Sequence, residues 1–392
     1  MSTNMRPTQG SVSTRDLARD NRGLALSTLV GGQTLSRMQI AELTGISPAT
    51  MSRLTPSLLE SGLLSEAGSD ETTGGRPSVM FRFNPNSRMI LAVDIDEHSL
   101  DLAEVNLVGE IRRRRTLPVI SKSAEEKLEY LVETVVNAVS DKVGDHPYVA
   151  VGISVPSPVD ADGKVMMAPA LGWYDVELGK LLRERVEIPV VIENDVNLVA
   201  YAEYKLGDWG DIESLAAIGV YEGVGAGIVE NGRLWRGRGG AAGQFGRMLA
   251  DSSGLKPRGP AYGQMESRLG SAAIRARAVA AGLIPAESPT AERVFLAATE
   301  GDERTLAFIA EIAAEFATHL TNFCVVVAPD RVVFAGLFAK WAELMLPIIG
   351  ELIEPALLQP PALAMASTGP DGKVIGAGLY AFEQVGGLES LV

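Results

Sequence analysis

The sequence predicts an α/β protein in which a small N-terminal winged helix-turn-helix precedes a larger, two-lobed body. Residues 15–85 carry three helical patterns followed by two short strands, which is the element order of a winged helix. The rest of the chain alternates strands with helices and has glycine-rich turns at 223–227 and 376–378. Because 392 residues exceed one ordinary core, we expect a flexible arm over 1–14 and separate domains over 15–85 and 88–392.

Composition limits the classes of protein to which this chain can belong. Apolar residues make up 46% and charged residues 21%, as in globular proteins. The single cysteine, Cys324, excludes a disulfide framework, and no segment has the pattern of a signal peptide or a membrane span. We therefore expect a cytoplasmic protein with no membrane partner.

The net charge of −14 is unevenly distributed. Residues 1–85 hold eight Arg, no Lys and seven Asp or Glu, whereas the remaining residues hold 27 basic and 42 acidic groups. The acidic body argues against nonspecific nucleic-acid binding by the whole surface. The near-neutral head is compatible with a small DNA-binding module whose contacts are local, and equally with another polar N-terminal appendage.

Two helices joined by a short turn are predicted within the head. A capping box at Ser36 starts the first helix, and Ile40 and Leu43 give it an apolar face. Gly45 suits the left-handed residue that ends this helix, and Ser47 caps the next one. This is the helix-turn-helix arrangement, whose second helix reads the major groove of DNA. The candidate DNA contacts are small, hydroxylated or basic side chains near the starts of these helices: Arg37, Ser47, Ala49, Thr50, Ser52 and Arg53.

A wing is predicted after the second helix. It consists of a strand at 62–64, a polar tip at 65–75 and an alternating strand at 79–83. Arg76, beside two glycines and a proline, is placed to enter a minor groove. A three-helix protein-interaction domain would share much of this pattern. Because one short reading helix needs two adjacent half-sites, DNA binding would imply a homodimer, or a higher homo-oligomer, on a palindromic operator of double-stranded DNA.

The body is predicted to consist of two related halves. Its strands are expected at 89–95, 101–106, 112–119, 149–155, 190–192, 215–221 and 331–334, and its helices at 125–143, 196–204, 303–323 and from 376. This order is that of the actin-like ATPase fold, with a small lobe over 88–195 and 376–392 and a large lobe over 196–375. The apolar stripe on 303–323 could belong either to the core or to a dimer contact.

The body resembles the ROK family of repressors, open reading frames and sugar kinases, because several motifs occur here in the family's order. These motifs are GISVP at 152–156, GW at 172–173, ENDVN at 193–197, GAG at 225–227 and GQFGR at 243–247. The resemblance covers residues 88–392, and an N-terminal winged helix is what separates the family's repressors from its kinases. It implies a chain of the xylose-repressor and N-acetylglucosamine-repressor type.

The resemblance also implies where a nucleotide would bind. In the family's kinases, an Asp followed by two glycines and a threonine cradles the phosphates. Here the carboxylates of Asp96 and Glu97 replace the glycines, and Glu222 stands in the second glycine-rich turn. Carboxylates repel a triphosphate, and side chains hinder the close approach of backbone amides. We therefore expect Asp195 to be a vestigial catalytic base, with no ATP cofactor and no enzyme activity.

The family's sugar and zinc sites are altered as well. Arg247 stands at the position of the zinc-binding histidine, and no cysteine lies within range at 256–264, so we expect no metal. The candidate ligand-binding residues match family positions around the sugar: Asn194, Asp195, Gln244, Arg247 and Glu266. Arg247 either binds an acidic or phosphorylated ligand, or it pairs with Glu266 or Asp195 and fills the pocket.

These expectations combine into a DNA-binding transcriptional regulator, a repressor of carbohydrate-related genes whose kinase-like domain senses a sugar or sugar derivative. Two other functions stay open at this point. An active ATP-dependent sugar kinase with a DNA-binding head would turn over ATP through Asp195. A ligand-independent DNA-binding protein would have its pocket filled by Arg247.

Overall fold

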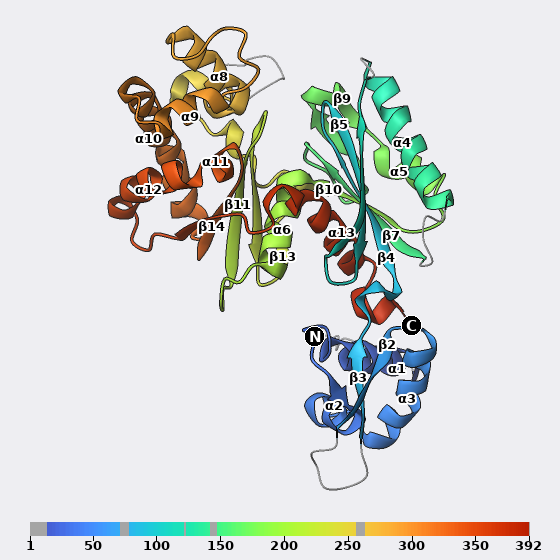
Figure 1. Cartoon of the computed structure of the whole chain (residues 1–392). Helices are drawn as coiled ribbons and strands as arrows, with labels where there is room; N and C mark the ends of the chain where they lie inside the picture. The colour runs from blue at the N-terminus through green and yellow to red at the C-terminus, as the bar shows by residue number, and fades with distance from the viewer. Residues whose placement is uncertain (1–13, 71–77, 121–122, 142–146, 256–262, 392) are drawn as a thin grey trace, which may run out of the picture.

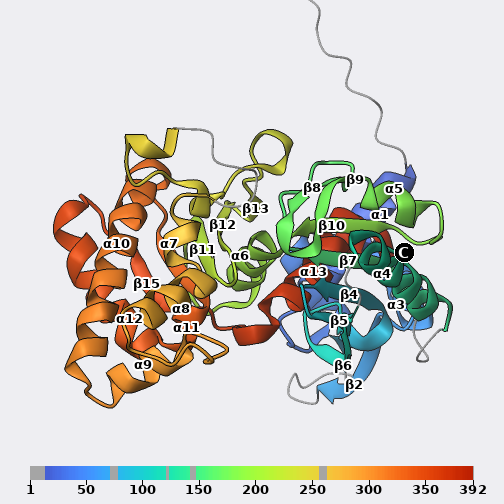
Figure 2. The ribbon, with the colours of Figure 1, turned by 90° about the horizontal axis from the view of Figure 1, so that it is seen from above.

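The computed structural model describes residues 14–70, 78–120, 123–141, 147–255 and 263–391. Figure 1 shows a small head at the bottom, a small lobe above it and a large lobe beside the small one. Seen from above in Figure 2, the two lobes lie side by side. Apart from Thr14, the expected arm lies outside the described residues. Across the described segments, every helix is too short or too polar to cross a membrane.

The head combines helices with a small antiparallel sheet. Its elements are α1 (Thr14–Ser27), β1 (Leu35–Ser36), α2 (Arg37–Thr44), α3 (Pro48–Glu60), β2 (Leu64–Asp70) and β3 (Ser78–Phe83). The strands pair in the order β1-β3-β2, and β1 was not expected from the sequence. Ser36 Oγ accepts the Gln39 N–H, and the Gln39 side chain accepts the Ser36 N–H, so the predicted capping box is present.

The turn between α2 and α3 forms as predicted, whereas the apolar face of α2 does not. Gly45 has φ of 72°, the left-handed conformation that ends α2. Ile40 is buried, but Leu43 is 65% exposed. The expectation for Leu43 was wrong because the buried face of this short helix contains Ile40 and Ala41. Leu43 follows Ala41 by two residues, so its side chain points to the side of the helix opposite to that of Ala41.

The small lobe is a mixed sheet covered on both faces. Its strands β4 (Met89–Ile95), β5 (Ser99–Asn106), β6 (Ile111–Pro118), β7 (Tyr148–Val155) and β10 (Val190–Asn194) lie in the order β10-β7-β4-β5-β6. One face packs against α4 (Ala124–Ser140), α5 (Leu178–Arg183) and the hairpin β8 (Val165–Ala168) and β9 (Trp173–Val176), and the other against α13 (Gly372–Gln384). β4, β7 and β10 are parallel, so the carboxyl ends of all of them meet at one edge.

The large lobe has its own mixed sheet, in the order β13-β12-β11-β14-β15. Its strands are β11 (Ser214–Val220), β12 (Val224–Glu230), β13 (Arg233–Leu234), β14 (Arg331–Gly336) and β15 (Ala362–Met365). Its helices are α6 (Asp195–Leu206), α7 (Glu266–Leu269), α8 (Ser271–Ala280), α9 (Glu292–Thr299), α10 (Glu303–Val327), α11 (Leu337–Lys340) and α12 (Ala342–Ile353). α6 packs on one face of this sheet, and α10 and α12 on the other.

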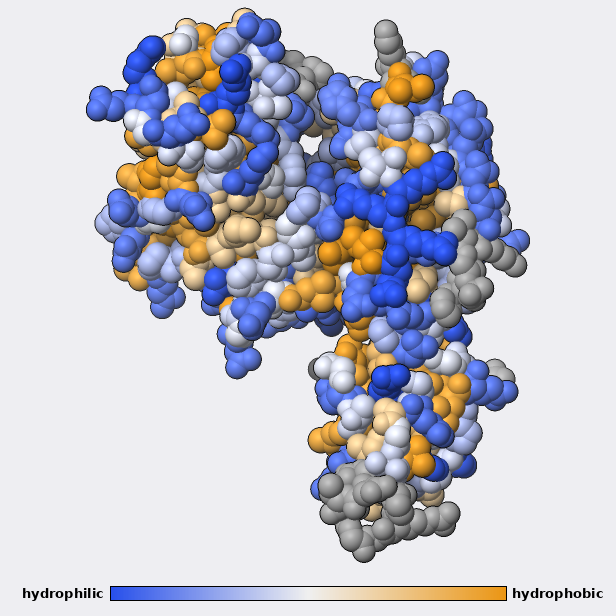
Figure 3. All heavy atoms as spheres, in the orientation of Figure 1, coloured by the Kyte–Doolittle hydropathy of each residue, from blue (hydrophilic) through white to orange (hydrophobic). Residues whose placement is uncertain are grey.

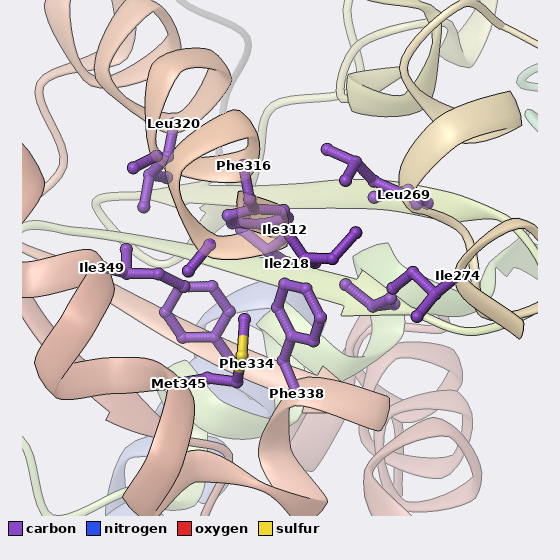
Figure 4. Packing of buried hydrophobic residues seen from close by; sticks show 14 of the residues in the cluster. Ile218, Leu269, Ile274, Ile312, Phe316, Leu320, Phe334, Phe338, Met345 and Ile349 are labelled. Carbon is purple, nitrogen blue, oxygen red and sulfur yellow. The ribbon is translucent and has the colours of Figure 1, made fainter. Parts of the chain in front are cut away.

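The apolar stripe of α10 belongs to the core of the large lobe. Ile312, Phe316 and Leu320 are fully buried. Figure 4 shows Phe316 among Phe334 of β14 and Phe338 of α11, with ring centroids 5.8 and 4.9 Å away. Of the two possibilities left open by the sequence, core packing is therefore the one that the structure adopts.

Helices α6 and α13 pack against each other between the lobes (Figure 1). The last helix was expected to start at 376, but it starts at Gly372. Gly376 and Gly378 lie inside it for a packing reason. A Cβ at Gly376 would lie 2.0 Å from the Leu198 carbonyl oxygen, and one at Gly378 would lie 2.8 Å from Val105. Gly376 thus permits the close contact of α13 with α6, and Gly378 permits its close contact with β5.

A buried carboxylate fixes the turn that leads into α13. Glu203 of α6 is fully buried and accepts hydrogen bonds from the backbone N–H and hydroxyl groups of Ser367 and Thr368, at 2.5–2.9 Å. We expect Glu203→Ala to lower the free energy of unfolding by about 2–4 kcal/mol, since these donors would lose a charged acceptor. Denaturant titration of the full chain measures this loss of unfolding free energy. The exposed Glu213→Ala is the control, and a loss below about 0.5 kcal/mol for Glu203→Ala would contradict this prediction.

The head is packed onto the small lobe and not merely tethered to it. After α13 the chain forms a short 3₁₀ helix, η8 (Gly387–Leu391), which packs along α1. The head core is continuous with Ile90, Leu107 and Phe382 of the lobe. Arg19 of α1 donates from Nε to the Glu389 carbonyl oxygen at 3.0 Å. Figure 1 shows the C-terminus at this junction, directly above the head.

Candidate functional site

A cavity of 510 Å³ lies between the two lobes, where Figure 3 shows a hollow in the surface. Its walls contain all the predicted ligand-binding residues, namely Asn194, Asp195, Gln244, Arg247 and Glu266. They also contain the residues predicted to exclude phosphates, Asp96, Glu97 and Glu222, together with Lys340 and Lys373. Both predicted groups, which are far apart in the sequence, therefore face the same cavity.

The turn from β10 into α6 fixes Asn194 and Asp195. Asn194 Oδ1 caps the helix by accepting the N–H groups of Val196 and Asn197 at 3.0 and 3.1 Å. Asn194 Nδ2 donates to Asp195 Oδ1 at 3.0 Å, and the Val196 N–H donates to the same oxygen at 2.9 Å. Asp195 Oδ1 is thus held by two donors, while Asp195 Oδ2 faces Lys373.

Lys373, in the first turn of α13, was missed in the sequence analysis. Its Nζ lies 3.4 Å from Asp195 Oδ2 and 3.8 Å from Asp94 Oδ2, and 4.2 Å from the centre of the Tyr221 ring. Burial alone would lower the pKa of Lys373, but the two carboxylates outweigh burial and raise it. Burial in turn raises the pKa of Asp94, which Lys373 opposes. No local sequence signal marks Lys373 for this contact, because both carboxylates lie far from it in the chain.

The turn after β4 is closed by its own carboxylate. Asp96 Oδ1 accepts the N–H groups of His98 and Ser99, each at 2.7 Å, and Oδ2 accepts the Ser99 hydroxyl at 2.9 Å. Backbone amides that could cradle a phosphate are therefore already occupied. The exposed carboxylates of Glu97 and Glu222 line the same region. These residues do not fit the anionic tail of ATP.

The opposite wall combines a fixed glutamate with an arginine that has no carboxylate partner among the described residues. Glu266 Oε1 accepts the Val224 N–H at 3.0 Å, and burial raises its pKa. Arg247 is exposed, and its Nη2 contacts Met167 Sδ at 3.5 Å. Arg247 thus forms no salt bridge with Glu266 or Asp195 that would fill the pocket, although its charge lowers the pKa of Glu266 and so opposes the effect of burial. Gln244 is half-buried in the same wall.

A second buried charge pair ties the lobes together beside the cavity. Arg236, which follows β13, lies with Nε 2.6 Å from Glu193 Oε2. Its Nη2 also donates to the carbonyl oxygens of Val159 and Asp160 at 2.9 and 3.1 Å. Glu193 is 1% exposed, and its other oxygen accepts from Asn197 Nδ2 at 3.0 Å. Arg236 thus connects the large lobe to the small lobe.

A metal site was not expected from the sequence. Within the described part of the chain, no three His, Cys, Asp or Glu side chains come together in a way that could hold a metal ion. Most of the segment at 256–264, where the family's cysteines stand, lies outside the described residues. The absence of a metal therefore stays a prediction.

The predicted DNA contacts lie near the start of α3. Ser47, Ala49, Ser52 and Arg53 are exposed, and Thr50 is half-buried. Ala49, Ser52 and Arg53 share one helix face because they are spaced by three and four residues. Ser47 Oγ accepts the Thr50 N–H at 3.2 Å and lies 2.9 Å from the Thr50 hydroxyl. Part of the hydrogen-bonding capacity of the Ser47 hydroxyl is therefore used to cap α3.

The two remaining predicted contacts lie outside α3. Arg37 of α2 is exposed, and its guanidinium lies 5.7 Å from the centre of the Phe81 ring in β3. That distance allows the guanidinium to rest against the sheet of the wing while its outer edge faces solvent. Arg76 falls outside the described residues, so its predicted place in a minor groove is not addressed by the structure.

The body, its motifs and the interlobe cavity can now be compared with known proteins. Residues 90–383 match the sequence profile of the ROK family, which is most of the chain. The chain belongs to the ROK family. The family predicted from the motif order is thereby confirmed.

Two xylose repressors, one of them putative, and a dual transcriptional regulator are similar to this chain. The putative xylose repressor of Caldicellulosiruptor sp. strain Rt8B.4 is 33% identical over 237 residues, which are 59% of each chain. The xylose repressor of Caldicellulosiruptor bescii is 27% identical over 350 residues, covering 86% of this chain and 88% of its own. The DNA-binding transcriptional dual regulator NagC of Escherichia coli K12 is 24% identical over 364 residues, covering 90% and 89%. The predicted repressor subgroup is the one to which these relatives belong.

Solved ROK structures share the fold. A ROK family transcriptional regulator, described as a homolog of the Escherichia coli MLC protein, has a TM-score of 0.80 at 22% identity and covers 96% of this chain and 98% of its own. A ROK glucokinase from Streptomyces griseus, in complex with glucose and AMPPNP, has a TM-score of 0.64 at 25% identity. The match covers 75% of this chain and 99% of the glucokinase. The predicted two-lobed fold is therefore confirmed, and kinases and regulators of the ROK family share it.

Proposed function

We propose that this chain is a cytoplasmic, DNA-binding transcriptional repressor, acting as a homodimer on a palindromic operator, whose non-catalytic ROK domain senses a sugar or sugar derivative. The observation that carries the proposal is the contact of Lys373 with both Asp94 and Asp195 in a chain that also presents an exposed helix-turn-helix. A kinase needs Asp195 free to take the proton of the attacking hydroxyl, whereas here the Lys373 ammonium lies 3.4 Å from Asp195 Oδ2.

Two further observations support this function over that of a kinase. The Asp96 carboxylate occupies the amides at which a phosphate would rest. The relatives that cover most of the chain carry the names of repressors and of a dual regulator. A ligand-independent DNA binder is disfavoured because Arg247 does not fill the cavity.

Regulation would follow from the position of the cavity between the lobes. A sugar that contacts both walls favours one interlobe angle, and a change in that angle alters the spacing of two heads in a dimer. Since the head is packed on the small lobe, it would move with that lobe. We expect the sugar to weaken operator binding by about tenfold or more, in the range of ordinary allosteric couplings.

One set of measurements separates the three functions. Double-stranded DNA selected by the full chain from a random library yields the operator, and its affinity is then measured with and without a panel of sugars, sugar acids and sugar phosphates. We expect a palindromic site, a lower affinity with at least one sugar, and no ATP consumption with any. ATP turnover that is abolished by Asp195→Asn would instead identify a kinase. Operator binding that responds to none of the compounds would identify a ligand-independent DNA binder.

A further inference from the structure

The floor of the interlobe cavity pairs a hydrogen-bond acceptor with a donor. Asp195 Oδ1 is held by Asn194 and Val196, whereas Asp195 Oδ2 accepts no hydrogen bond from any described residue. The Lys373 ammonium lies 3.4 Å from that oxygen and likewise has no hydrogen-bond partner among the described residues, although its side chain is only 15% exposed. Both groups line the cavity.

A hydroxyl group is the natural ligand for such a pair. It donates one hydrogen and accepts others, so a single hydroxyl can donate to Asp195 Oδ2 and accept from Lys373 Nζ. Both bonds would be charge-assisted, which makes them stronger than bonds between neutral groups. We propose that Lys373 and Asp195 form a hydroxyl-binding site that accepts an unphosphorylated sugar and rejects a sugar whose hydroxyl at this site carries a phosphate ester. This inference rests on the proposed sugar-sensing function.

The charges around the floor explain the rejection. The ammonium of Lys373 lies between the carboxylates of Asp94 and Asp195, so it leaves no net positive charge for a phosphate. Three further carboxylates line the same cavity at Asp96, Glu97 and Glu222, against two other cations among the described residues, Lys340 and Arg247, of which Arg247 lies on the opposite wall. A phosphate ester carries between one and two negative charges at neutral pH and would be repelled by this group. The same electrostatics that exclude ATP therefore select among sugars.

Isothermal titration calorimetry on the full chain tests the proposal by comparing free sugars with their phosphate esters. Glucose is compared with glucose 6-phosphate and glucose 1-phosphate, and N-acetylglucosamine is compared with its 6-phosphate. Xylose is added as a sugar that lacks the sixth carbon. We expect at least one free sugar to bind at least about tenfold more tightly than at least one of its phosphate esters. Lys373→Met should lower the affinity of the chain for that free sugar by about tenfold or more, as expected for the loss of a charge-assisted hydrogen bond. Lys180→Met, which removes an exposed lysine of α5, should change its affinity less than about threefold.

The outcomes separate this inference from the function on which it rests. If every phosphate ester binds as tightly as its parent sugar and releases operator DNA, this inference is overturned and the sugar-responsive repressor stands. Sugar affinity unchanged in a folded Lys373→Met variant would also overturn it. If that variant does not fold, the comparison of free and phosphorylated sugars on the unmodified chain still decides. Failure of every probe to bind would overturn both proposals.

Discussion

Replacing Arg53 with alanine is expected to lower the affinity for the operator by about two orders of magnitude. Arg53 is exposed on the same face of α3 as Ala49 and Ser52, so its guanidinium can reach a guanine edge or a phosphate. One bidentate contact to a base contributes roughly 1–3 kcal/mol. In a symmetric dimer the substitution removes this contact from both half-sites, so its effect on the free energy of binding is doubled.

Electrophoretic mobility shifts or fluorescence anisotropy with the selected operator measure this loss. Arg185→Ala is the matched control because it also removes an exposed arginine, but from the small lobe, and we expect it to bind as the unmodified chain does. Both variants should keep the same thermal unfolding midpoint, since neither side chain is buried. Operator affinity within about threefold of the unmodified chain for Arg53→Ala would show that Arg53 does not contact the operator.

The sequence was informative wherever a local signal determined the structure. The capping box at Ser36, the left-handed Gly45 and the motif order around Asp195 each depend on residues close together in the chain, and the structure contains the turns that they predict. Leu43 was misplaced because eight residues of helix leave its buried face to be chosen by tertiary packing. Strand β1 was missed because its two residues become a strand only by pairing with β3.

The candidate site shows the same division. The family motifs predicted that Asn194 and Glu266 would line one ligand site, and both residues line the interlobe cavity. Lys373 could not be found in that way, because its role depends on a contact with Asp94 and Asp195, which are far away in the sequence. Nor could the sequence decide whether Arg247 pairs with a carboxylate, since that depends on which side-chain conformation the surrounding space allows.

Helix α13 connects the two functional parts of the molecule. Its first turn carries Lys373 at the floor of the cavity, and its last turns place Phe382 in the core shared with the head. The chain then continues into η8, whose Leu388 and Leu391 pack against that same core. A helix is stiff over this length, so a displacement at the cavity is carried to α1 with little loss. The described structure thus joins the cavity to the head through α13 and η8.

This link predicts that a variant with Leu388→Asp and Leu391→Asp loses its response to sugar. Charged side chains cannot pack against the apolar core of the head, so η8 should detach from α1 and the head should no longer follow the small lobe. We expect the change in operator affinity caused by the sugar to fall below about twofold, from about tenfold or more in the unmodified chain. Sugar binding itself should change less than about threefold, because neither leucine lines the cavity.

The link can be tested by operator titrations with and without the sugar, combined with calorimetry of sugar binding and with thermal unfolding of the head. The two half-buried leucines together should contribute about 2 kcal/mol to the stability of the head, less than two fully buried ones would. Leu358→Asp is the control, since Leu358 of the large lobe is fully exposed and its replacement should alter neither stability nor response. A double variant that binds the operator and still responds fully to the sugar would show that the signal bypasses η8, and the direct contacts of the head with Ile90, Leu107 and Phe382 would then carry it.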